Sequence, residues 1–260
     1  MVILDEIVAQ KHRDVTIRAT QTPQSVLEAK ATNRSVTRSL WHALDLDGVG
    51  IIAEIKRRSP TGGTFAHNID PAQWAIDYAT AGASAVSILT DEPYFGGTHD
   101  DLKKARAAMG IPTIQKDFVV TDYQLYEAAV VGADAVLLIA GITPGHELRH
   151  RIDLTHSLQM EALVEVHTDE EVDQALVAGA KIIGINNRNL RAFTTDLAVT
   201  EELCKLVPDE ILVVSESGVH SPHDVQRMVN AGVDGILVGE SIMTATDPIA
   251  QIKSLIAAGE

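Results

Sequence analysis

The sequence predicts an α/β protein that folds as a (βα)8 TIM barrel with an N-terminal helical extension. Eight short apolar runs recur along the 260 residues, and stretches with helical periodicity separate most of them. A phrase of small residues around a glycine also repeats four times, at intervals that fit two strand–helix units. We therefore expect a single domain over residues 1–260, with the extension at 1–46 and the barrel at 47–260.

The apolar runs are predicted to be parallel strands, because each is short, rich in β-branched residues and bounded by turn residues. After the first gap most runs begin 22 to 28 residues apart, which leaves room for one helix between neighbours. The expected strands are 49–56, 85–90, 112–118, 135–140, 161–167, 182–188, 211–217 and 235–241. The clearest helices are 71–81, 121–131, 168–178, 221–231 and a final helix at 247–258.

The repeated phrase places a glycine just before a strand at positions 82, 132, 179 and 232, with spacings of 50, 47 and 53 residues. Each glycine is expected to end a helix in the left-handed conformation, which other residues adopt at a cost. A doubly wound sheet is the competing fold. It fits less well, because it seldom uses eight evenly spaced strands and no Gly-x-Gly-x-x-Gly motif follows a strand here.

The extension is predicted to contain an amphipathic helix, because apolar residues recur on one side of it. A second, shorter helix is expected around 35–44, and we expect both helices to cover one end of the barrel. The side of the first helix is traced by Ile3, Leu4, Ile7, Val8, Lys11 and Val15.

The composition limits the classes of partner and the cellular compartment that we expect for this protein. A net charge of −15 argues against nucleic acids and anionic membranes as partners. The chain has one cysteine, which gives no disulfide framework and fits a reducing compartment. Asp5 and Glu6 interrupt the region where a signal peptide needs an apolar core. We therefore expect a cytoplasmic protein; the oligomeric state is not readable from the sequence, and a monomer is favoured.

Charged and polar side chains end most of the expected strands. In a (βα)8 barrel the carboxyl ends of the strands form the active-site mouth. Each polar strand end could singly be a detail of packing or solvation, but cations and carboxylates that ring one mouth indicate catalysis. The side chains concerned are Glu54, Lys56, Lys116, Glu165, Asn186, Arg188 and Glu216.

The last two strands end in glycine-containing segments that predict a phosphate site. Ser217-Gly218 and Gly239-Glu240-Ser241 allow close backbone approach, and free N–H groups of the helices that follow attract anions. The alternative is that these glycines only permit tight turns. Gly62-Gly63, after the first strand, predict a movable loop over the mouth.

Two histidine patterns could indicate metal, and we expect no metal at either. His146-Glu147-Leu148-Arg149-His150 matches the zinc-protease pattern, but it begins an outer helix and no third ligand follows at the usual spacing. Glu165-Val166-His167 could form a metal pair, yet His167 is expected to shape the loop above Glu165.

The strand-end motifs, taken in order over essentially the whole chain, resemble indole-3-glycerol-phosphate synthase. Two positions depart from that family's pattern: Gln115 stands where an arginine is common, and Thr61 stands where a serine is usual. Gln115 is expected to face the helix layer. The motifs are Glu54-Ile55-Lys56-Arg57-Arg58-Ser59-Pro60, Lys116-Asp117-Phe118, Val164-Glu165-Val166-His167, Asn186-Asn187-Arg188-Asn189-Leu190, Ser215-Glu216-Ser217-Gly218 and Val238-Gly239-Glu240.

The resemblance implies a carboxy-lyase of tryptophan biosynthesis that needs no cofactor. The family closes the ring of 1-(2-carboxyphenylamino)-1-deoxyribulose 5-phosphate, decarboxylates it and dehydrates it to indole-3-glycerol phosphate. Lys116 would protonate the ribulose carbonyl, with a pKa lowered by Lys56 and by burial. Glu165 would be the acid or base of the dehydration, assisted by Glu54 and Lys56. The division of steps among these four residues stays open.

The resemblance also implies which residues hold the small phosphorylated substrate. Asn186 would bind substrate hydroxyls or the carbonyl oxygen, Arg188 would approach the aryl carboxylate, and Phe118 would form a wall for the aryl ring. Lys56 and Ser59 would join the phosphate site. The full substrate-binding set is Arg188, Phe118, Ser59, Glu216, Ser217, Gly218, Gly239, Glu240 and Ser241.

Two other functions fit parts of the sequence pattern. Another phosphate-binding barrel, such as phosphoribosylanthranilate isomerase, shares the glycine-containing ends of the last strands but lacks the Glu-x-Lys, Lys-Asp-Phe and Val-Glu-Val-His motifs. A catalytically inactive barrel kept as a binding protein should have lost Lys116 or Glu165, and both are present. A fused second enzyme is not expected, because one helix at 247–258 follows the eighth unit.

Overall fold

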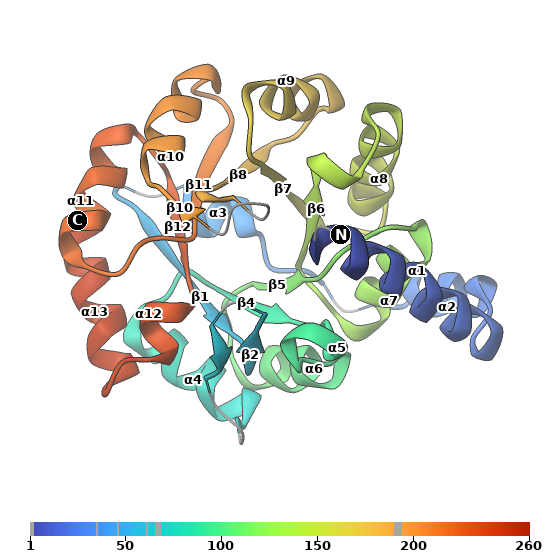
Figure 1. Ribbon diagram of the computed structural model, residues 1–260. Coiled ribbons are helices and arrows are strands. Elements are labelled where there is room, and N and C mark those ends of the chain that lie inside the picture. Colours follow the sequence, from blue (N-terminus) through green and yellow to red (C-terminus); the bar gives the residue numbers. More distant parts are fainter. Residues whose placement is uncertain (1–2, 35, 46, 61, 66–68, 190–193) are drawn as a thin grey trace.

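The computed structural model describes residues 3–34, 36–45, 47–60, 62–65, 69–189 and 194–260. Within them, eight parallel strands close into a barrel in which each strand lies between its neighbours in the chain (Figure 1). All eight predicted strands are confirmed, and each is shorter than predicted at one or both ends. The strands are β1 (Gly50–Ile55), β4 (Ala85–Leu89), β5 (Thr113–Lys116), β6 (Ala135–Ile139), β7 (Glu161–Val166), β8 (Ile182–Asn186), β11 (Leu212–Glu216) and β12 (Gly235–Val238).

Helices surround the barrel, and the five helices predicted most clearly are confirmed to within one residue at each end. The short helices α5 (Glu92–Phe95) and α12 (Glu240–Met243) lie in loops, as do 3-10 turns at Ala140–Ile142 and Cys204–Leu206. The surrounding helices are α4 (Pro71–Ala81), α6 (His99–Ala108), α7 (Asp122–Val131), α8 (Gly145–Ser157), α9 (Asp169–Ala178), α10 (Ala198–Leu203), α11 (Pro222–Ala231) and α13 (Pro248–Gly259).

The repeated glycines end their helices as predicted. Gly82, Gly132, Gly179 and Gly232 are the C-caps of α4, α7, α9 and α11, with φ of 102°, 93°, 90° and 84°. Their N–H groups bond back to carbonyls of the last helical turn, which turns the chain directly toward the next strand. The repeat therefore sets short, similar connections at the amino ends of four strands.

Two apolar layers lie on the two faces of the barrel sheet. Alternate strand residues point inward and form the barrel interior, while the others pack against the helices. On β5, Ile114 belongs to the interior layer, so Lys116 points the same way one step nearer the mouth. On β7, Leu163 and Glu165 repeat this arrangement. The inward-facing charged residues therefore lie directly above the apolar interior of the barrel, away from bulk water.

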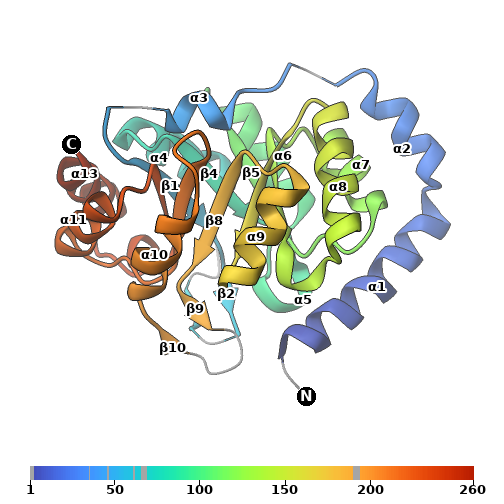
Figure 2. The same cartoon turned by 90° about the horizontal axis from the view of Figure 1, so that it is seen from above.

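Two small hairpins rise from the carboxyl ends of the strands, and the sequence did not predict them. β2 (Arg58–Ser59) pairs with β3 (Gly63–Thr64) after β1, and β9 (Arg188–Asn189) pairs with β10 (Thr194–Thr195) after β8. Both lie at the same end of the barrel in Figure 2. They are two-residue ladders with mixed polar sequence, which strand periodicity cannot detect. Movement of the first loop stays a prediction, and Thr61 lies outside the described residues.

The N-terminal extension contains α1 (Ile3–Gln21), α2 (Gln24–Ala31) and α3 (Leu40–Leu44), and α2 was not predicted. The helix predicted at 35–44 is confirmed in a shorter form, with residue 35 outside the described residues. The expectation that the extension covers one end is wrong: α1 begins near the mouth, whereas α3 closes the opposite end (Figure 2). None of the described helices is long and apolar enough to cross a membrane.

The closure by α3 depends on Leu40 and Leu44, which are fully buried and join the interior layer of the barrel. A Cβ on Gly50 or Gly235 would come within 2.9 or 3.0 Å of the Leu44 side chain. The first residues of β1 and β12 are therefore small because Leu44 fills the space between them.

We predict that Leu44→Ala lowers the free energy of unfolding by about 2–5 kcal/mol, because it leaves a cavity in the barrel interior. Urea denaturation of both proteins measures the difference. Val36→Ala, at a residue that is 88% exposed, is the control and should change stability by less than about 0.5 kcal/mol. Equal stabilities for the two variants would contradict the closing role of α3.

Candidate active site

A cavity opens at the carboxyl ends of the strands. Each of the eight barrel strands, or the loop that directly follows it, supplies residues that line this cavity. Of the predicted site residues, all but Ser241 line it. The Ser241 hydroxyl instead donates to the Val219 carbonyl at 3.3 Å. The lining residues that were predicted are Glu54, Lys56, Ser59, Lys116, Phe118, Glu165, Asn186, Arg188, Glu216, Ser217, Gly218, Gly239 and Glu240.

The floor of the cavity carries a buried ammonium between two carboxylates. Lys116 Nζ lies 3.2 Å from Glu165 Oε2 and 3.2 Å from Glu216 Oε2. The three side chains come from β5, β7 and β11 and converge because all of them point inward. Gly184, on the intervening β8, leaves the space for Glu216: a Cβ there would lie 2.2 Å from Glu216 Oε1. That oxygen is buried and has no hydrogen-bond partner among the described residues.

A second ion pair stands beside the first. Lys56 Nζ lies 2.9 Å from Glu54 Oε1, and the ammonium is 5.5 Å from the centre of the Phe65 ring. A Cβ on Gly239 would come 2.4 Å from Glu54 Oε1 and 3.1 Å from Lys56 Nζ. Gly239 is therefore required by the side-chain pair on neighbouring β1, a reason that the sequence pattern did not reveal.

The surroundings set the charge of each group at neutral pH. Burial would lower the pKa of Lys116, but Glu216, Glu165 and Glu54 raise it above the ordinary lysine value. The predicted lowering of this pKa is therefore wrong, because three carboxylates outweigh burial. Lys116 is an ammonium at neutral pH.

The carboxyl groups divide into two kinds. Burial opposes ionisation of Glu54 and Glu165, yet the cations hold both pKa values below the ordinary range: Lys56 acts chiefly on Glu54, and Lys116 on Glu165. Burial raises the pKa of Glu216 to about 7, against the pull of Lys116 and with the help of the Glu165 charge. Glu216 therefore exchanges its proton near neutrality, while the other two remain ionised.

Polar residues at the end of β8 and directly after it lie beside this cluster. Asn186 Oδ1 accepts a hydrogen bond from Arg188 N at 3.0 Å, and the Asn186 side chain also bonds to Glu165. Arg188 Nη2 lies 3.2 Å from Glu240 Oε2 across the mouth. The guanidinium and the amide are thus held over the cavity by neighbouring groups.

One wall of the cavity is apolar. The Phe118 and Phe95 rings lie with centroids 6.1 Å apart, and Leu4 and Ile7 of α1 also line the cavity. Of this wall only Phe118 was predicted from the sequence, because the other residues are not part of a polar strand end. Strand alternation could have found part of it, since Leu137 and Ile139 follow one another on the inner face of β6.

The segment after β11 has a strained, well-supported backbone. Ser217 has φ of 65° and Gly218 of 89°. The buried Asn187 side chain supports this turn: its Nδ2 donates to Ser215 Oγ, Glu216 O and Ser217 O, each at 3.0 Å. Asn187 lies within the Asn186–Leu190 motif, and no role for it was predicted from the sequence. A serine held at positive φ costs free energy, which is typical of backbone shaped for a ligand.

The histidine patterns take up other contacts. His167 Nε2 lies 3.5 Å from Glu165 Oε1, and Glu171 accepts from His167 N at 2.7 Å. His150, on the outer helix α8, contacts Asp122 at 2.6 Å. The described residues contain no group of three His, Cys, Asp or Glu side chains placed to hold a metal ion. Gln115 faces the helix layer as predicted, 3.3 Å from His99 of α6.

Comparison with known proteins identifies the family. The family model described as indole-3-glycerol phosphate synthase matches residues 4–255. The chain belongs to the indole-3-glycerol phosphate synthase family. The family predicted from the strand-end motifs is therefore confirmed, and with it the predicted carboxy-lyase of tryptophan biosynthesis.

Curated relatives agree over the whole chain. Proteins named indole-3-glycerol phosphate synthase from Beutenbergia cavernae and Streptomyces griseus are 43% and 42% identical; each match covers 100% of this chain and 96% of the relative. The Carboxydothermus hydrogenoformans protein of the same name is 47% identical over 80% of each chain. A solved thiamine phosphate pyrophosphorylase from Pyrococcus furiosus shares the fold, with a TM-score of 0.62 and 18% identity, covering 85% of this chain and 97% of that one.

We predict that Glu216 makes stability fall as pH rises. Its folded pKa of about 7 exceeds the ordinary 4.5, so its contribution is fully present below pH 4.5 and is lost as pH rises to about 7. The difference in free energy of unfolding between the wild type and Glu216→Gln, measured by urea denaturation from pH 4.5 to 8, should follow this course. Glu210→Gln, at an exposed carboxylate, controls for the loss of one charge. A difference independent of pH would contradict the assignment.

Proposed function

We propose that this cavity carries out the family reaction on 1-(2-carboxyphenylamino)-1-deoxyribulose 5-phosphate. The observation that supports it most is the Lys116 ammonium held on the cavity floor between Glu165 and Glu216. A charged donor, two acceptors and an adjacent aromatic wall match a substrate that has a carbonyl, an amine and an aryl ring. The cytoplasmic location and the monomeric state stay predictions from the sequence.

Ring closure needs a proton at the ribulose carbonyl oxygen. As the aryl carbon that bears the carboxylate attacks, the carbonyl π electrons move to oxygen, and Lys116 supplies the proton that makes it a hydroxyl. The Lys116 contacts of 3.2 Å are longer than the 2.7–2.9 Å of a strong charged hydrogen bond. One N–H of the ammonium can therefore turn to the substrate at little cost.

Loss of carbon dioxide then returns an electron pair to the ring and restores its aromaticity. The arylamine nitrogen pushes its electron pair into the ring during closure and regains it when carbon dioxide leaves, so no cofactor is needed. Dehydration follows, in which a base removes a proton from the substrate as an acid protonates the departing hydroxyl. Glu165 is an ionised carboxylate suited to the base, and Glu216, whose pKa is about 7, suits the acid.

The remaining residues are assigned to substrate binding. Phe118 and Phe95 pack on the aryl ring, Arg188 pairs with the aryl carboxylate, and Asn186 binds a substrate oxygen. Lys56 and Ser59, with the backbone from 217 to 218 and from 239 to 240, bind the phosphate. Ser241 would join only through its backbone, because its hydroxyl is bonded to Val219.

We predict that Lys116→Ala and Glu165→Gln each lower kcat by about 10²–10⁴-fold, because each removes a proton-transfer group. The assay follows the fluorescence of the indole product from the carboxyphenylamino substrate. Lys205→Ala and Glu210→Gln make the same changes at exposed positions and should keep wild-type turnover. Turnover near that of the wild type would remove the residue from the catalytic set, and a folded wild type without product would refute the proposed function.

We predict that chelation leaves the reaction unchanged, because every step in this scheme is carried by side chains and by the substrate nitrogen. The wild type dialysed against EDTA should keep its kcat within error, and added zinc should not raise it. Loss of activity in EDTA that zinc restores would contradict the scheme.

A further inference from the structure

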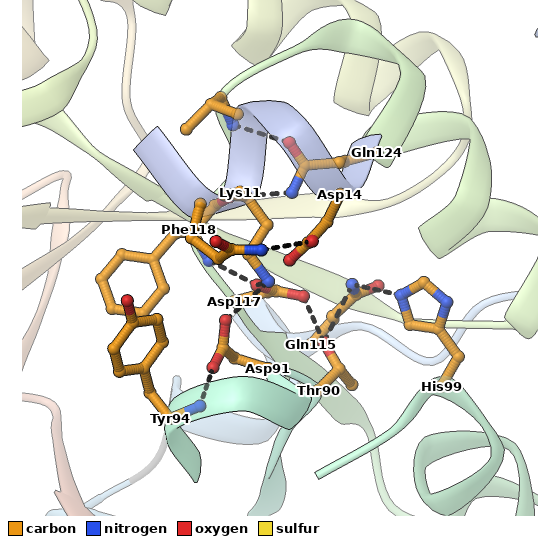
Figure 3. Close-up of polar contacts among 12 residues, drawn as sticks. Lys11, Asp14, Thr90, Asp91, Tyr94, His99, Gln115, Asp117, Phe118 and Gln124 are labelled. Carbon is orange, nitrogen blue, oxygen red and sulfur yellow. Dashed lines mark hydrogen bonds and ion pairs between the residues drawn. The ribbon is translucent and has the colours of Figure 1, made fainter. Parts of the chain in front are cut away.

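A buried cation of the N-terminal extension lies just outside the cavity. Lys11 Nζ, on α1, lies 2.7 Å from Asp91 Oδ2 and 2.7 Å from Asp117 Oδ1, and the three side chains are at most 4% exposed (Figure 3). Burying three charged groups costs free energy that their attraction only partly offsets, so such clusters can be kept for specificity. Lys11 itself does not line the cavity.

Asp117 connects this cluster to the catalytic strand end. It stands between Lys116 and Phe118, which both line the cavity. Its Oδ1 also accepts from Phe118 N at 2.7 Å, and its Oδ2 accepts from Thr90 Oγ1 at 2.8 Å. Both oxygens of the Asp117 carboxylate are thus engaged (Figure 3), and this carboxylate holds the backbone amide of Phe118, two residues from Lys116.

Asp91 connects the same lysine to the aromatic wall. Its Oδ1 accepts from Tyr94 N at 2.9 Å and caps α5, the one-turn helix that carries Phe95. Phe95 in turn contacts the Phe118 ring. Asp117 therefore holds the backbone of Phe118, Asp91 caps the helix that carries Phe95, and both carboxylates pair with the Lys11 ammonium.

Lys11 also fixes α1 against the mouth. Leu4, Ile7 and Lys11 are spaced by three and four residues, so they lie on one face of the helix. Ile7 and Leu4 line the cavity, about one and two helical turns from Lys11. A second ion pair attaches α1 elsewhere: Arg18 bonds to Glu127 of α7 at 2.8 and 2.9 Å, away from the cavity lining.

We propose that Lys11 is a positioning residue for the reaction, which acts through Asp117 and Asp91 to align Lys116, Phe118 and Phe95 and to seat Leu4 and Ile7 over the substrate. The inference rests on the proposed function of the cavity. It assigns the first helix a role in catalysis that is distinct from its attachment to the barrel.

The test compares Lys11→Met with Arg18→Met, since each removes one cation that attaches α1. Steady-state kinetics of indole product formation are measured at a temperature where circular dichroism shows both variants fully folded. We expect Lys11→Met to lower kcat at least tenfold, with a smaller rise in KM, because Lys116 is misaligned even at saturating substrate. Arg18→Met should change kcat and KM less than twofold. Lys11→Arg, which keeps the charge, should recover part of the lost kcat.

Unchanged kcat in Lys11→Met would overturn the inference, and so would an equal loss in Arg18→Met, which would indicate attachment alone. If Lys11→Met does not fold, Asp117→Asn replaces it in the test, because the amide oxygen can still accept from Phe118 N while the ion pair is lost. Asp117→Asn should lower kcat by a similar factor. A wild-type kcat in this variant would overturn the inference. The proposed function fails separately, when the wild type itself forms no product.

Discussion

The charge of Lys116 is the constraint on which the site depends. An ammonium on the floor of an apolar barrel is costly unless carboxylates surround it, and Glu165 and Glu216 both lie 3.2 Å away. Burial raises the pKa of Glu216 to about 7, and the charge of Glu165 adds to this rise although Lys116 opposes it. The cluster thus contains both an ionised base, Glu165, and a group that titrates near neutrality, Glu216.

The barrel has space for this cluster because glycines, which carry no side chain, lie next to it. Gly184 lies on β8 and Gly239 directly follows β12, and a Cβ at either position would press on a carboxylate oxygen. Below the cluster, Leu40 and Leu44 of α3 are fully buried in the far end of the barrel and extend its apolar interior. Above it, the two hairpins and α1 form the rim. The catalytic groups, the α3 leucines that close the far end and the rim therefore come from separate parts of the chain that the closed sheet brings together.

The sequence was sufficient for the strands, because inward-facing apolar residues alternate through each of them and the repeated glycines mark where helices end. It was also sufficient for the polar residues of the mouth, since Glu54, Lys116 and Glu165 continue the inner face of their strands. It was insufficient where the outcome depends on neighbours in space. The raised pKa of Lys116 reflects carboxylates from distant strands, and the Ser241 hydroxyl turns to Val219. The contact of Lys11 with two aspartates from separate loops has no periodicity that a sequence pattern could reveal.

The protonation state of Lys116 tests the account most directly. Heteronuclear NMR of protein with 15N-labelled lysine, with the signal assigned through Lys116→Arg, would follow the Lys116 amine as pH is raised from 6 to 10. We expect an ammonium signal throughout, because the surrounding carboxylates raise the pKa of this group above the ordinary lysine value of 10.5. Deprotonation with a midpoint below that value would contradict it, and would mean that burial rather than Glu165 and Glu216 governs the charge on the cavity floor.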